Sequence, residues 1–153
     1  MAADYTRTYK RFGKYAIEEV LEKVPYDCDG KPINDMPDDL VFNDLKVHMT
    51  SMRYRTFKKS GVKCVTCGIE GQYFMLEQPY LQENKSRAHF NLYAIDEDGN
   101  EVQMTKDHIH PVSRSGRNMI TNFQTMCAAC NLNKGNVMPN RIGKKKNKKR
   151  NNE

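Results

Sequence analysis

The sequence predicts an α+β fold with N-terminal helices, a small antiparallel sheet and a disordered basic tail. Apolar residues recur at helical spacing near the N-terminus, and two alternating segments flank a turn, Asp96-Glu-Asp-Gly-Asn100. Two Cys-x-x-Cys pairs lie on either side of this hairpin. A chain of 153 residues suits one domain, but only 38% of its residues are hydrophobic, so a structural metal would help to hold it together.

The N-terminal part, residues 1–60, is predicted to be helical. Residues 15–24 carry apolar side chains at helical spacing, and Pro25 ends that pattern. A second helix is predicted over residues 38–59, with Gly61 directly after it. Four cations lie near its end: Arg53, Arg55, Lys58 and Lys59. Either they form a solvated helix end or they form an edge that contacts phosphates.

Strands are predicted at three segments, residues 73–77, 89–96 and 102–106. The turn between the second and the third contains a glycine where φ can be positive. The third strand delivers Asp107 and His108 at its end. Residues 61–140, which hold these strands and the cysteine pairs, are predicted to form the functional domain.

Four of the five cysteines form two pairs, Cys64 with Cys67 and Cys127 with Cys130. Each pair can bend round a metal, and four thiolates suit Zn²⁺ in a closed, structural site. The pairs are 60 residues apart, so the site must join two distant parts of the chain. A redox role is the weaker alternative, since neither pair lies in a βαβ pattern. The fifth, Cys28, is predicted to be an idle thiol.

A second group of polar residues surrounds the second cysteine pair: Asp107, His108, Asn122 and Asn131. Oxygen ligands from Asp and Asn suit Mg²⁺ or Mn²⁺, and a nearby imidazole can deprotonate water near neutral pH. A hard cation and a general base together suit hydrolysis of a phosphodiester. Asp107 and His108 would face opposite sides of an ideal strand, so the chain must leave strand geometry near Pro111 if both serve one site.

These residues resemble the HNH endonucleases, also called ββα-metal or His-Me finger nucleases. The resemblance covers the run Asp107-His108-Ile109-His110-Pro111, then Asn122, then residues 127–135 with the pattern Cys-x-x-Cys-Asn-x-x-Lys-Gly. Cys64 and Cys67 resemble the upstream pair of the zinc-containing branch. The family implies a ββα-metal finger that cleaves DNA.

The resemblance also implies roles for single residues. His108 would be the general base, and Asn122 would brace the loop that orients it. Asp107 and Asn131 would hold one Mg²⁺-type ion, and an Asn where many relatives have His favours a hard metal. Lys134 would lie beside the phosphates. Further phosphate contacts are predicted for two loop cations, Arg114 and Arg117.

Two other readings stay open at this point. A zinc-containing protein that binds DNA without cleaving it is the main alternative. A purely structural zinc protein would leave Asp107, His108 and Asn131 unexplained. His110 is predicted to contact the substrate or simply to be exposed, and His48 and His89 are expected to be ordinary histidines.

The net charge of +6 lies in the C-terminal segment. Residues 141–153 hold seven basic residues and one acid, whereas the other 140 residues balance 18 basic against 18 acidic ones. This segment is too polar to fold and is predicted to be a disordered arm that contacts phosphates. The alternative is a solubilising end. The cations predicted to bind nucleic acid are Lys144, Lys145, Lys146, Lys148, Lys149 and Arg150.

The beginning of the sequence carries charges where a signal peptide has an apolar run, and no segment is apolar enough to span a bilayer. A cytoplasmic protein is therefore expected, in the cytoplasm of the host cell if the gene belongs to a phage. Small relatives of the family are common in phages and mobile elements. DNA is the expected partner.

Overall fold

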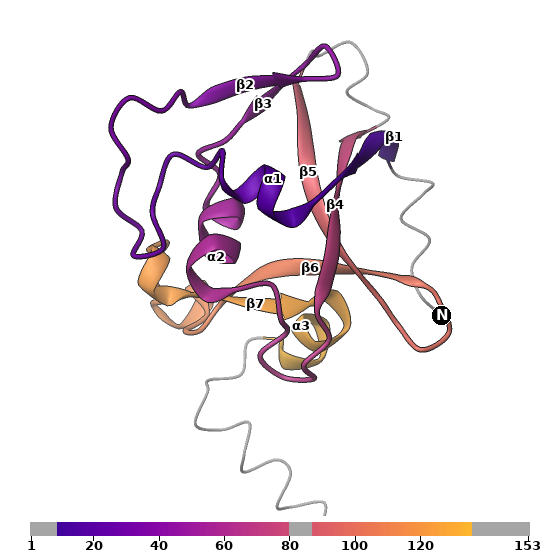
Figure 1. Cartoon of the computed structure of the whole chain (residues 1–153). Helices are drawn as coiled ribbons and strands as arrows, with labels where there is room; N and C mark the ends of the chain where they lie inside the picture. The colour runs from indigo at the N-terminus through magenta and orange to yellow at the C-terminus, as the bar shows by residue number, and fades with distance from the viewer. Residues whose placement is uncertain (1–8, 80–86, 136–153) are drawn as a thin grey trace, which may run out of the picture.

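Seven strands and three α-helices make up residues 9–79 and 87–135, which are the part of the chain that the computed structural model describes (Figure 1). The strands are β1 (Tyr9–Tyr15), β2 (Asp39–Phe42), β3 (Leu45–His48), β4 (Gly71–Pro79), β5 (Arg87–Ile95), β6 (Glu101–His108) and β7 (Phe123–Cys127). The helices are α1 (Ile17–Leu21), α2 (Met52–Ser60) and α3 (Ala128–Lys134). The prediction of an α+β fold is confirmed in this general form. The predicted basic tail, residues 141–153, lies outside the described residues.

The strands form one curled sheet with β4 and β5 at its centre. The strand order runs β1-β4-β5-β3-β2, and β6 pairs with both β5 and β7. All pairings are antiparallel except the short one between β3 and β5. The three predicted strands are confirmed as β4, β5 and β6. The predicted turn is also confirmed, because the Asp96 carboxylate accepts hydrogen bonds from the N–H groups of Asp98 and Asn100, and Gly99 has φ 81°.

The helix predicted over residues 38–59 is wrong in its first half. Residues 39–48 form the hairpin of β2 and β3, and only the second half is helical, as α2. The hairpin loop is Asn43-Asp44, with φ 50° and 63°. Two consecutive positive φ values define the tight turn that best matches the twist of paired strands, and Asn and Asp tolerate this conformation. Gly61 ends α2 as predicted, with its N–H bonded to the carbonyl of Phe57.

The prediction of a helical N-terminal region is also corrected. Within the described part of residues 1–60, three strands accompany two short helices. The helical pattern of residues 15–24 becomes α1, which is only five residues long. The preceding strand β1 contains a bulge between Arg11 and Gly13, and Gly13 has φ 141°. A bulge shifts the alternation of inward and outward residues, so the strand pattern is hidden in the sequence.

The centre of the core consists of aromatic rings from α2, β4 and β5 that pack against one another. Phe74 of β4 and Phe90 of β5 lie 6.0 Å apart between ring centres, and Tyr54 of α2 packs against both at 6.3 Å. The Tyr54 hydroxyl also accepts a hydrogen bond of 2.8 Å from the N–H of Phe90. All three side chains are buried. This contact fixes α2 against the sheet.

A buried ion network ties β1 to three other strands. Glu77 of β4 is fully buried and binds Arg11 of β1 at 3.2 Å and Asn91 of β5 at 3.0 Å. Arg11 also makes two bonds to Glu101 of β6, at 2.8 and 3.0 Å. Burial acts to raise the pKa of Glu101, but hydrogen bonds from Arg11 and Tyr73 outweigh it and lower the pKa. Because Arg11 links β1 to β4 and β6, this network helps to hold the sheet in its curled shape.

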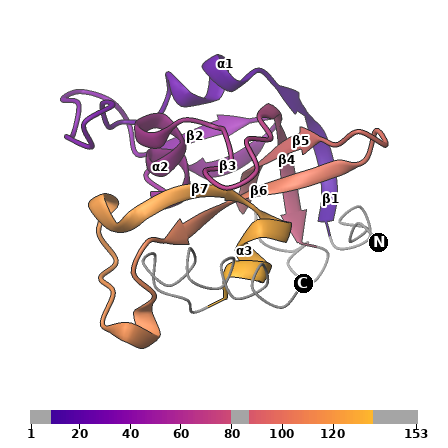
Figure 2. The same ribbon diagram turned by 90° about the horizontal axis from the view of Figure 1, so that it is seen from below.

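The β6–β7 hairpin lies between α2 and α3 (Figures 1 and 2). Its two faces are distinguished by their contacts. On one face the Thr125 hydroxyl donates to the carbonyl of Gly61, at the end of α2. On the other face Asp107 pairs with Lys134 of α3. No helix in residues 9–79 and 87–135 is both long enough and apolar enough to cross a membrane.

Candidate functional site

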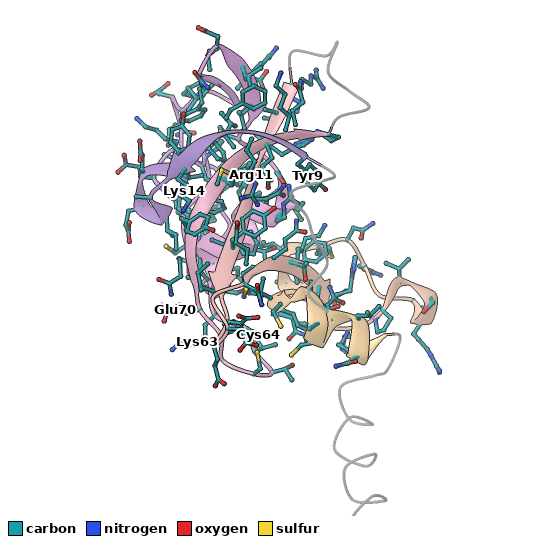
Figure 3. The ribbon with its side chains drawn as sticks, turned by 90° about the vertical axis from the view of Figure 1, so that its right-hand side faces the viewer. Tyr9, Arg11, Lys14, Lys63, Cys64 and Glu70 are labelled. Atoms are coloured by element: carbon teal, nitrogen blue, oxygen red, sulfur yellow. The ribbon has the colours of Figure 1, made fainter. Side chains whose placement is uncertain are left out.

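The four paired cysteines converge although 60 residues separate the two pairs. Their Sγ atoms all lie within 4.8 Å of one another, and those of Cys67 and Cys127 are 3.8 Å apart. Sulfur ligands about 2.3 Å from a tetrahedral Zn²⁺ lie about 3.8 Å from each other, so the thiols fit such a metal. Cys64 lies near Lys63 and Glu70 in the lower part of Figure 3, below Tyr9, Arg11 and Lys14.

Local backbone contacts shape both cysteine pairs. The N–H of Gly68, which has φ 80°, donates to the carbonyl of Cys64, and Val65 donates to the carbonyl of Thr125 in β7. The second pair begins α3, where the Cys127 sulfur accepts from the N–H of Cys130 at 3.5 Å. The first turn is thus held against the strand that leads into the second pair.

Electrostatics differ among the four thiols. Burial acts to raise the pKa of Cys64, but hydrogen bonds from the backbone of Cys67, Cys127 and Thr66 outweigh it and lower the pKa to about 6. Burial raises the pKa of Cys127 and that of Cys130. The thiolate is the form that binds a metal, so Cys64 is prepared as a ligand at neutral pH. Cys28 is exposed and stands apart from the four.

The predicted general base, His108, is the last residue of β6. Its ring packs edge-on against Phe123 with 4.8 Å between centroids. Its Nε2 lies 2.7 Å from the amide oxygen of Asn118. An amide oxygen only accepts, so Nε2 is the nitrogen that donates. In the neutral imidazole Nδ1 is then the nitrogen without a proton, and it can act as a base. Asn118 was not predicted from the sequence.

Asn122 holds the loop between β6 and β7 closed. Its amide oxygen accepts from the N–H of His110 at 2.9 Å, and its amide nitrogen donates to the carbonyls of His110 and Arg117 at 3.1 and 2.8 Å. Its own carbonyl accepts from the N–H of Ile109. These bonds span both ends of the loop that carries Asn118. Such contacts are what the predicted loop-bracing role requires.

Asp107 and Lys134 form a buried pair on the α3 face of the hairpin. The Lys134 ammonium lies 2.9 Å from Oδ2 of Asp107 and 2.7 Å from the carbonyl of His108. Only 4% of the Lys134 side chain is exposed, so the structure does not place this residue on a surface for phosphates, contrary to the prediction. A buried lysine needs an acid beside it, and Asp107 provides it. The pair joins α3 to the end of β6.

Two oxygen atoms on the same face can accept a cation. Both polar contacts of the Asp107 side chain, with Lys134 and with Gln124 at 3.0 Å, go to Oδ2. Asn131 uses its amide nitrogen, which donates to Thr105 at 2.9 Å. Within the described residues, neither Asp107 Oδ1 nor Asn131 Oδ1 has a hydrogen-bond partner. Neither atom is among the buried polar atoms of these residues that lack a partner, so both are open to solvent. A carboxylate and an amide oxygen are donors that suit Mg²⁺ or Mn²⁺, which fill their other positions with water and phosphate oxygens.

The loop after β6 forms a pocket of about 340 Å³. Arg114, Arg117 and His110 line it, and all three residues are exposed. Gly116 makes the tight loop possible, because a Cβ atom there would lie 1.7 Å from the carbonyl oxygen of His110. The two arginines thus lie in the loop that also carries Asn118, at a surface that an anion can reach. The six predicted contacts of residues 144–150 lie outside the described residues.

Comparison with known proteins agrees with the motif. Residues 96–147 match a family model described as HNH endonuclease. The matched segment runs from the turn before β6 to beyond α3, so it includes Asp107, His108, Asn122 and Asn131, while Cys64 and Cys67 lie before it. The resemblance inferred from the sequence is confirmed. No curated protein and no solved structure matches the chain.

Proposed function

We propose that this chain, whose residues 96–147 belong to the HNH endonuclease family, is a metal-dependent nuclease that hydrolyses phosphodiester bonds of DNA. The observation that carries the proposal is the position of His108. Asn118 and Phe123 hold its ring at the end of β6, one residue from the Asp107 carboxylate. The β6–β7 hairpin and α3 would then form the ββα-metal finger of this family.

In the proposed reaction His108 acts on water. Its Nδ1 accepts a proton from a water molecule, and the water oxygen forms a bond to phosphorus as the bond from phosphorus to the 3′ oxygen breaks. The leaving oxygen takes its proton from solvent. Asp107 and Asn131 would hold Mg²⁺ or Mn²⁺, which neutralises charge on the phosphate and on the leaving oxygen.

Zn²⁺ is the metal that the four cysteines suit best, and we propose a structural role for it. All four ligands come from the protein, so no position is left for a substrate. The site joins the turn at Cys64–Cys67 to the first turn of α3 and so fixes the helix that carries Asn131 and Lys134. A cytoplasmic location, in a phage host or elsewhere, stays a prediction.

Cleavage of supercoiled plasmid tests the proposed function directly. Purified protein should nick or linearise the plasmid with Mg²⁺ or Mn²⁺ and should leave it intact with EDTA. A zinc-containing protein without catalysis would instead retard the plasmid in a gel and leave it supercoiled under all conditions. That result, obtained with folded protein, would overturn the proposal.

Asn118 is proposed as a positioning residue for His108. Asn118→Ala removes the hydrogen bond that selects the protonated nitrogen of His108, and one such bond is worth about 1 kcal/mol, so turnover should fall about fivefold to tenfold. KM for DNA and the unfolding midpoint should change little, because the side chain is exposed and has one described contact.

Single-turnover cleavage at saturating DNA measures this effect. Asn100→Ala, in the turn between β5 and β6, is the matched control because it removes an amide away from the site. An Asn118→Ala protein with unchanged turnover would show that Asn118 does not position the base.

A further inference from the structure

Thr105 of β6 lies on the same face of the hairpin as Asp107 and contacts Asn131, the other proposed ligand of the cation. Thr105 and Asp107 are two residues apart on one strand, so their side chains point to the same side, about 7 Å apart along the strand. Asn131 of α3 donates its amide nitrogen to the hydroxyl oxygen of Thr105 at 2.9 Å. The contact therefore ties the α3 ligand to the strand that carries the other one.

The direction of the Thr105 hydroxyl group is set by the backbone of β7. The hydroxyl donates its proton to the carbonyl of Met126, which is the cross-strand partner of Thr105, at 2.7 Å. A hydroxyl group has one proton and two lone pairs. Toward Asn131 the Thr105 oxygen can therefore only accept, so the group that faces it must be the amide nitrogen of Asn131 and not the amide oxygen.

This orientation decides whether Asn131 can bind a cation. With its nitrogen on Thr105, the amide directs its oxygen elsewhere, and only the oxygen is a ligand for Mg²⁺ or Mn²⁺. A reversed amide would present two N–H donors to the cation and would set its oxygen against the oxygen of Thr105, unless the bond to Met126 broke. Both side chains line a pocket of about 390 Å³ beside the exposed residues Leu132 and Gly135, so an ion and its waters can reach them.

We propose that Thr105 is a positioning residue that presents the amide oxygen of Asn131 to a divalent cation. Asp107 is oriented in an equivalent way, because Gln124 and Lys134 both contact its Oδ2 and leave Oδ1 open. Thr105 acts through Asn131 and does not itself touch the ion. The identity of the ion, Mg²⁺ or Mn²⁺, rests on the proposed function, but the role of Thr105 can be tested without cleavage.

Thr105→Val removes the hydroxyl group and keeps the shape of the side chain. The amide of Asn131 then loses the contact that selects its orientation, and one neutral hydrogen bond contributes a factor of about five, so Kd for Mn²⁺ should rise about fivefold. The zinc-loaded full chain is titrated with Mn²⁺ without DNA, and electron paramagnetic resonance measures the free ion. In single-turnover cleavage the Mg²⁺ concentration for half the maximal rate should rise by the same factor, whereas the rate at saturating Mg²⁺ should change little.

Two further variants make this result specific. Thr105→Ser restores the hydroxyl group and should bring Kd for Mn²⁺ back toward that of the unmodified chain. Thr56→Val is the matched control, because the buried Thr56 hydroxyl of α2 also donates to a carbonyl at 2.7 Å, that of Met52. Its loss should leave Kd for Mn²⁺ unchanged.

Asn131→Asp tests whether Thr105 acts through the orientation of the amide. A carboxylate has two equivalent oxygens, so either one can face the cation and no orientation has to be selected. In the Asn131→Asp protein, Thr105→Val should therefore no longer weaken the binding of Mn²⁺. A loss as large as in the unmodified chain would show that the two positions act independently, which would overturn the inference.

The remaining outcomes separate this inference from the proposed function. If Thr105→Val binds Mn²⁺ as tightly as the unmodified chain, or if the unmodified chain binds no Mn²⁺, the inference is overturned, whether or not the chain cleaves plasmid. If Kd for Mn²⁺ rises as expected but no plasmid is cleaved, the role of Thr105 at a cation site stands and the nuclease proposal fails.

Discussion

His108→Ala is expected to abolish cleavage of DNA while binding of DNA and of zinc persists. A positioned general base contributes about 10²- to 10⁴-fold to a hydrolysis rate, so loss of the imidazole should remove most of the activity. Single-turnover cleavage of plasmid with Mg²⁺, together with binding in EDTA, measures both parts of this prediction.

His110→Ala is the matched control for this experiment. His110 is two residues further along, its backbone is held by Asn122, and the residue lines the loop pocket. Loss of this imidazole should reduce cleavage much less than loss of His108. Undiminished nicking by His108→Ala, or equal losses in both variants, would mean that the base has been assigned to the wrong residue.

The residues of the site could be predicted because they follow one another in the sequence at the spacing of a known motif. The Asp-His pair, Asn122 and Cys127–Gly135 lie within 30 residues, so local sequence sufficed to find them. Convergence of the two cysteine pairs could also be predicted, since four thiolates suit one metal. The surroundings of these residues could not be predicted in this way. Asn118 lies only four residues before Asn122, but an amide in a loop carries no signal of the ring that it contacts.

Partners distant in sequence account for the remaining differences. Lys134 and Asp107 are 27 positions apart, and only the packing of α3 against β6 shows that they neutralise each other. Tyr54 and Phe90 are 36 positions apart, and only their hydrogen bond shows that α2 packs against β5. In residues 38–48 the apolar residues predicted a helix although their helical spacing is irregular. Asn43 and Asp44 adopt the positive φ values of a tight turn, and the segment forms a hairpin. Residues that favour a turn are thus a stronger signal here than a weak helical periodicity.

The second large effect concerns the four cysteines. Cys64→Ser or Cys127→Ser should lose the bound metal and unfold the domain. Binding of Zn²⁺ to four thiolates is worth about 10–16 kcal/mol in small zinc peptides, whereas a whole domain is stable by about 5–15 kcal/mol. The metal would join the turn that contains Cys67 to the start of α3. Without it, α3, which carries Asn131 and Lys134, would no longer be held in place at its first turn. Elemental analysis should find about one zinc per chain in the unmodified protein and little in either variant.

Cys28→Ser is the control that separates the loss of a metal ligand from the effect of replacing any cysteine by serine. Cys28 is exposed and is no part of the cluster, so its replacement should leave zinc content, the unfolding midpoint and cleavage unchanged. Thermal unfolding followed by circular dichroism, with and without a chelator, should show a cooperative transition that the chelator removes in the unmodified chain and in Cys28→Ser. A protein with all four paired cysteines replaced by serine that still folds and cleaves DNA would show that the thiols hold no structural metal.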